Sequence, residues 1–139
     1  MILKVSFAVV IFSIFEMSLL CLSVYGHASP IAYNPEQNQI FHSIQSIPDK
    51  LTIIFSETPE IKASAIKVID EKNNSRIDKN DLSLDVLEKK LSVSLDKSKI
   101  HPGTYIVKWI VLSKEDGYLT KGAYVFSLNN NNSSNQHQQ

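Results

Sequence analysis

The nine residues TYIVKWIVL, Thr104 to Leu112, decide the fold of this chain. Apolar residues alternate along this stretch with the two-residue period of a β-strand. One face carries the large side chains that we expect in the core, namely Tyr105, Val107, Trp109 and Val111. The opposite face carries three more apolar residues, Ile106, Ile110 and Leu112. A strand that is apolar on both faces is typical of a central strand covered on both sides.

Shorter runs with the same alternation extend from this strand in both directions. They cover residues 51–55, 66–68, 91–95 and 123–128, and a first short strand is expected around residues 31–33. A weaker run lies between residues 76 and 86, although residues 81–90 also fit one or two helical turns. About seven short antiparallel strands in roughly 100 residues predict an all-β fold, an immunoglobulin-like β-sandwich.

An apolar leader precedes the predicted sandwich. Lys4 supplies a positive charge, the apolar run Val5–Phe15 follows, and Val24-Tyr25-Gly26 offers residues that a signal peptidase tolerates. These features predict a signal peptide over residues 1–26. An uncleaved anchor is the alternative, because residues 5–25 are long enough to span a bilayer, although Glu16 would be costly there. Cleavage after Ala28 is a further alternative.

The rest of the chain divides into one domain and a tail. Residues 27–128 are long enough for a single small domain. Residues 129–139 consist of Asn, Gln, Ser and one histidine, His137. A segment of this composition buries no apolar surface, so we expect it to be disordered.

The composition restricts the chemistry of the exported domain. The 139 residues include 14 basic and 14 acidic residues, so the net charge gives no reason to expect nucleic acid or an anionic membrane as a partner. Cys21, Met1 and Met17 are the only sulfur-containing residues, and all lie in the leader. After cleavage the domain has no disulfide and no soft ligand for copper(I). We expect an extracytoplasmic monomer.

Cleavage after Gly26 would make His27 the first residue of the mature chain. Its α-amine and imidazole would then form a chelate of the kind that copper(II) favours. In a run of antiparallel strands, three places should meet at one end of the sandwich: His27, the corner at Ser56-Glu57 and the turn at residues 114–118. An amine, an imidazole and carboxylates could therefore converge. His42 and His101 are expected at the opposite end, as surface residues.

Several stretches, taken in order, resemble the CopC family of small periplasmic copper-binding proteins. The matching residues are His27-Ala28, Tyr33-Asn34-Pro35, the run LTIIFSE at 51–57, PGTYIVKW at 102–109, Asp116-Gly117 and GAYVF at 122–126. The resemblance covers essentially all of residues 27–128. It implies a β-sandwich that binds copper(II) through the amine and imidazole of its first histidine.

The resemblance also implies the remaining metal ligands. A carboxylate and a second histidine of the family's Asp-x-His motif map to Asp116 and Tyr118, and a glutamate beside the site maps to Glu57. Tyrosine in place of histidine is a departure that removes one imidazole. A phenol, with a reference pKa near 10, is a reluctant substitute at neutral pH. We therefore expect binding weaker than is typical of the family.

The function implied by the resemblance is that of an extracytoplasmic copper(II) carrier or buffer in copper homeostasis or resistance, with a membrane copper transporter as a partner. The alternative is an interaction or adhesion module of the same fold that has lost copper. We do not expect an enzyme, because the sequence has no Gly-x-Ser-x-Gly elbow and no phosphate-binding glycine loop. Copper oxygenases built on a similar sandwich need a second histidine, which position 118 does not supply.

Overall fold

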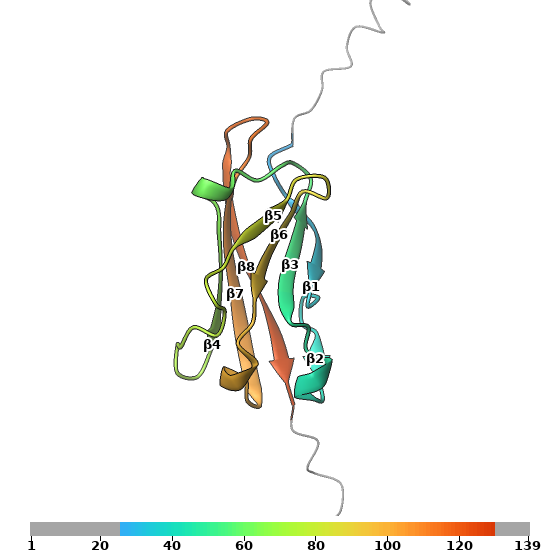
Figure 1. Cartoon of the computed structure of the whole chain (residues 1–139), viewed down its shortest axis with the longest axis vertical. Coiled ribbons are helices and arrows are strands. Elements are labelled where there is room, and N and C mark those ends of the chain that lie inside the picture. The colour runs from blue at the N-terminus through green and yellow to red at the C-terminus, as the bar shows by residue number, and fades with distance from the viewer. Residues whose placement is uncertain (1–25, 130–139) are drawn as a thin grey trace, which may run out of the picture.

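A computed structural model describes residues 26–129, which form two packed four-stranded sheets (Figure 1). The first sheet has the strand order β1-β3-β6-β5 and the second the order β2-β8-β7-β4. The strands are β1 (Pro30–Asn34), β2 (Ile40–Phe41), β3 (Lys50–Phe55), β4 (Ala65–Asp70), β5 (Ser83–Asp85), β6 (Lys90–Ser94), β7 (Gly103–Leu112) and β8 (Leu119–Leu128). Three short 3₁₀ helices are η1 (Ile44–Ser46), η2 (Ile61–Ala63) and η3 (Lys97–Lys99). The predicted all-β sandwich is confirmed.

Strand β7 lies between β8 and β4, so its predicted central position is confirmed. Its inward side chains are buried in the core between the sheets, namely Tyr105, Val107, Trp109 and Val111. The prediction that both faces are covered is wrong. The outward residues Ile106, Ile110 and Leu112 are only half-buried, since no further layer of the described chain lies over this face.

Trp109 and Gly122 face each other across the β7–β8 pair. A Cβ atom at position 122 would lie 2.5 Å from the Trp109 ring, so only glycine leaves room for the indole against the backbone of β8. The other side of the indole meets the Phe55 ring edge-on, with centroids 5.5 Å apart. This packing fixes β3 of the first sheet against β7 and β8 of the second.

The polar segment after β4 seals the outer edge of that strand. The buried carboxylate of Asp78 accepts a hydrogen bond from the Val68 amide at 2.7 Å and pairs with the Arg76 guanidinium. An edge covered in this way offers few free amides for pairing with another chain. The segment of weak alternation, residues 76–86, therefore begins with the residues that cover this edge and continues with the three residues of β5.

Two sequence predictions about the strands need correction. The structure describes eight strands, and the additional one, β2, pairs in parallel with β8. Residues 81–90 form β5 and a turn, with no helical turn. The extra strand does not change which loops lie at which end of the sandwich, because β2 continues the chain in the same direction as β1 (Figure 1).

Nearly all of the predicted signal peptide and nearly all of the predicted tail lie outside the described residues. Within residues 26–129, no helix is long and apolar enough to cross a membrane.

Candidate metal centre

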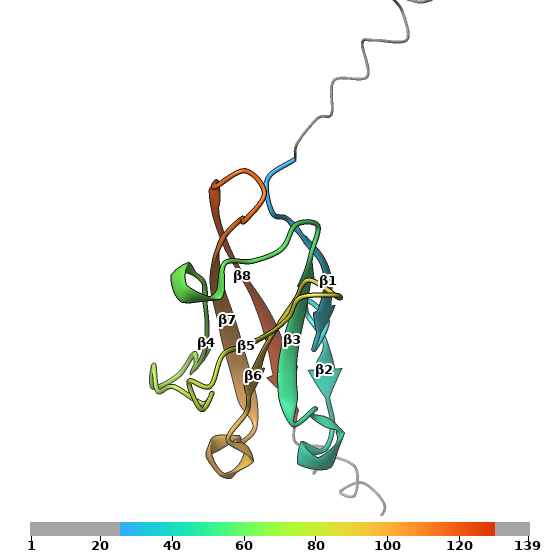
Figure 2. The same cartoon turned by 45° about the horizontal axis from the view of Figure 1, so that its top comes forward.

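Three segments that are distant in sequence meet at one end of the sandwich (Figure 2). We call this end the His27 pole, and it consists of residues 27–29, 56–58 and 113–118. Ser29 and Ser56 exchange two hydrogen bonds, one from each backbone amide, at 3.0 and 2.9 Å. Thr120 Oγ1 donates to the carbonyl of Ala28, whose side chain is fully buried. These contacts fix the chain directly after His27.

His27 meets Asp116 across this junction. Its Nδ1 atom lies 3.0 Å from Asp116 Oδ2, and the His27 side chain is half exposed. The other carboxylate oxygen, Oδ1, accepts a hydrogen bond from the Tyr118 amide at 2.8 Å. The Tyr118 amide, followed by His27, holds the pKa of the Asp116 carboxyl below its ordinary value of 3.8. The carboxylate is therefore charged at neutral pH and orientated toward the imidazole.

The distance between the two atoms fits adjacent ligands of one metal ion. Two ligands at right angles, each about 2.0 Å from a metal, lie about 2.8 Å apart. The observed 3.0 Å between Nδ1 and Oδ2 is close to that separation. The half-exposed imidazole leaves the approach open to solvent. The His27–Asp116 pair could therefore supply two adjacent ligands of one metal ion.

Tyr118 lies flat on the imidazole. The His27 and Tyr118 rings are 3.5 Å apart between centroids and nearly parallel, with 14° between their planes. The phenol oxygen lies in the plane of its own ring, above the plane of the imidazole. The ring of Tyr118 thus covers one face of the histidine.

Glu57 is buried beneath the hairpin turn between β7 and β8, where it accepts a hydrogen bond from Ser113 Oγ. Ser113 is buried as well, and its hydroxyl accepts hydrogen bonds from the amides of Glu115 and Asp116, at 3.0 and 3.3 Å. The Glu115 carboxylate accepts from the Thr58 amide at 2.9 Å and so ties the corner after β3 to the hairpin. Glu57 thus supports the loop that carries Asp116.

The sequence analysis did not identify Ser113, although its local sequence carries a recognisable signal. A serine that precedes a polar turn and bonds to amides two and three residues ahead is a common local motif.

The structure brings together His27, Asp116 and Tyr118, with Glu57 next to them below the turn. Among residues 26–129, no group of three or more His, Cys, Asp or Glu side chains could hold a metal. His42 and His101 lie near η1 and η3, at the end of the sandwich opposite the pole.

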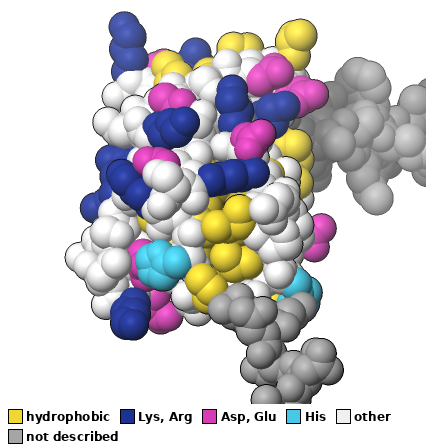
Figure 3. Space-filling model, turned by 60° about the horizontal axis from the view of Figure 1, so that its bottom comes forward, with side chains coloured by type: hydrophobic (Ala, Val, Ile, Leu, Met, Phe, Trp, Pro, Cys, Tyr) yellow, Lys and Arg dark blue, Asp and Glu magenta, His cyan; other side chains and the backbone are white. Residues whose placement is uncertain are grey.

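That opposite end carries intermixed basic and acidic side chains around a small apolar patch (Figure 3). His101 is half exposed there, and its Nε2 atom lies 2.9 Å from Oδ2 of the buried Asp70. The backbone amide of His101 also donates to the Tyr105 hydroxyl at 2.8 Å. These contacts fasten the loop before β7 to the end of β4, an arrangement that alternation in the sequence does not reveal.

Comparison with known proteins agrees with the observed fold. The family model of the CopC domain matches residues 32–129. The crystal structure of CopC from Methylosinus trichosporium OB3b is similar in fold, with a TM-score of 0.64 and 20% sequence identity over 76% of this chain and 96% of that one. No curated protein sequence matches the chain significantly. The chain belongs to the CopC family, which is a family of copper-related resistance proteins.

Proposed function

We propose that this protein binds one copper(II) ion at the His27 pole and carries or buffers it outside the cytoplasm. The metal would be held by the α-amine and Nδ1 of His27 and by Oδ2 of Asp116. The observation that carries this proposal is the 3.0 Å contact between Nδ1 and Oδ2, which joins residues 89 positions apart. Copper(II) favours such nitrogen and oxygen ligands in a tetragonal plane.

The other two predicted residues take supporting roles in this proposal. Tyr118 covers one face of the imidazole, and Glu57 holds the hairpin through Ser113. With three protein ligands, the fourth position of the plane is left for water or for a ligand of a receiving protein. A half-exposed site with an exchangeable position suits a carrier better than a permanent store. A membrane copper transporter is the recipient we propose.

A second candidate is an interaction module of the same fold that no longer handles copper. Tyr118 favours it, because the family resemblance expects an imidazole at that position. The ring stack alone would then be a packing feature of the pole. The two candidates differ in whether His27 is needed for copper binding.

A copper(II) titration of the exported protein separates them. The protein is expressed with its own leader, purified and titrated against a competing chelator, beside His27→Ala and the matched control His42→Ala. We expect one bound copper ion, with the same affinity, in the original protein and in His42→Ala. The His27→Ala variant should bind at least about 100-fold more weakly, since it loses the imidazole of the chelate. Equal affinity in all three proteins would refute the carrier proposal.

A further inference from the structure

The outer face of the second sheet carries basic and apolar side chains and no acidic ones. Two rows cross its strands in register: Ala65–Ile110–Lys121 and Lys67–Lys108–Ala123. The other outward positions of β4, β7 and β8 are Ile69, Thr104, Ile106, Leu112, Leu119, Val125 and Ser127. A chain with equal numbers of acidic and basic residues therefore presents a locally positive face.

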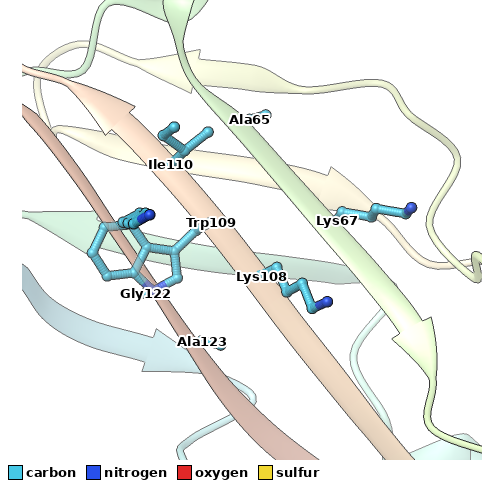
Figure 4. Close-up of a pocket in the computed structure, with 8 residues that line it drawn as sticks. Ala65, Lys67, Lys108, Trp109, Ile110, Gly122 and Ala123 are labelled. Atoms are coloured by element: carbon cyan, nitrogen blue, oxygen red, sulfur yellow. The ribbon is translucent and has the colours of Figure 1, made fainter.

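A hollow of about 550 Å³ lies over these two rows. Its floor is apolar and low, because Ala65 and Ala123 have small side chains. Figure 4 shows the indole of Trp109 beside Gly122, and Ile110 reaching toward Ala65. The volume is in the range of small-molecule sites, which are mostly apolar with a few polar groups around them.

The lysines around the hollow have no counter-charge. Lys67, Lys108 and Lys121 form no ion pair in the part of the chain that the structure describes. Lys67 and Lys108 are also direct cross-strand partners in adjacent strands (Figure 4). Like charges in directly opposite positions destabilise a sheet, and a bound anion would relieve that repulsion. A second copy of the same face would add three more ammonium groups, so a symmetric face-to-face dimer is disfavoured.

We propose that this hollow binds an amphiphilic carboxylate, a small molecule with an apolar body and one anionic head. The apolar body would lie on Ala65, Ile110 and Ala123. The carboxylate would lie between Lys67 and Lys108, where the like-charge pair needs an anion. The hollow lies on the outer sheet face and not at the His27 pole, so it does not depend on the proposed copper function.

Nuclear magnetic resonance titrations of the exported, ¹⁵N-labelled protein test this site. Three probes are compared: dodecanoate, dodecyltrimethylammonium with the same chain and opposite charge, and acetate as the head alone. Both dodecyl compounds are kept below their micelle concentrations. We expect saturable shifts from dodecanoate at the amides of Ala65, Ile110 and Ala123. Equal shifts from dodecyltrimethylammonium, or saturation by acetate at the same concentration, would overturn the proposal, as would dodecanoate shifts that do not saturate or that map elsewhere.

Variants of the hollow complete the test. The double variant Lys67→Glu/Lys108→Glu should raise the dissociation constant for dodecanoate at least about tenfold. Lys50→Glu, a single charge reversal on the other sheet, should leave it unchanged. Ala123→Phe keeps all the charges but fills the hollow, and it should also abolish binding. If Ala123→Phe binds dodecanoate as tightly as the original protein does, the apolar part of the proposal is wrong. This result does not depend on whether the double variant folds.

Discussion

Removing the ring of Tyr118 tests how this residue takes part in the proposed copper site. The ring lies 3.5 Å from the His27 imidazole at an angle of 14° and contacts its face. Aromatic pairs contribute about 0.5–1.5 kcal/mol beyond the area they bury. If that energy holds the imidazole in its binding orientation, Tyr118→Ala should weaken copper(II) binding by about two- to twelvefold. Tyr118→Phe keeps the ring and should leave the affinity unchanged.

The assay is competitive titration with a copper(II) chelator, with electron paramagnetic resonance to report the ligands. We expect the spectra of the original protein and of Tyr118→Phe to be the same, because the phenol oxygen lies outside the plane of the imidazole. A loss of affinity in Tyr118→Phe as large as in Tyr118→Ala, with a changed spectrum, would show that the phenol is a ligand. That result would refute the assignment of Tyr118 as a cover for His27.

Three further outcomes follow from the contacts described above. Gly122→Ala should lower the free energy of unfolding by about 1–3 kcal/mol, since its Cβ would lie 2.5 Å from the Trp109 ring; an unchanged midpoint in urea would contradict this packing. Asp116→Asn should weaken copper(II) binding at least about tenfold with little change in thermal midpoint, and equal affinity would exclude the carboxylate as a ligand. Copper binding should decline as pH falls below about 6, because an imidazole and an α-amine must lose protons to coordinate. The lowered pKa of Asp116 keeps its carboxylate charged through that range, so its contribution should be lost only as pH falls below 3.8. A pH titration that showed copper loss only below pH 3.8 would point to the carboxylate instead.

The long strands were predictable because their alternation is set by burial on one face. Strand β7 is the clearest case, since its four inward residues are all in the core. Whether its other face is covered was not predictable. The sequence shows that Ile106 and Ile110 are apolar, but it does not show whether another layer packs over them. Strand β2 was missed because two residues are too few to show a period.

The candidate site, like the fold, was predictable only in part. Strand direction alone placed His27 and the 114–118 turn at one end, and the contact of His27 with Asp116 agrees with that reasoning. The flat contact of Tyr118 with His27 depends on side-chain torsion angles, which the pattern of strands and turns does not predict. The hydrogen bond of Glu57 to Ser113 depends on how deeply the corner after β3 packs under the hairpin. Copper binding itself remains a prediction.

Native mass spectrometry of the exported protein with one equivalent of copper(II) tests the central claim most directly. It reports the first residue of the mature chain and the bound metal in the same spectrum. We predict a chain that begins at His27 and retains one copper ion. A chain that begins at any other residue and retains copper equally well would contradict the proposed chelate.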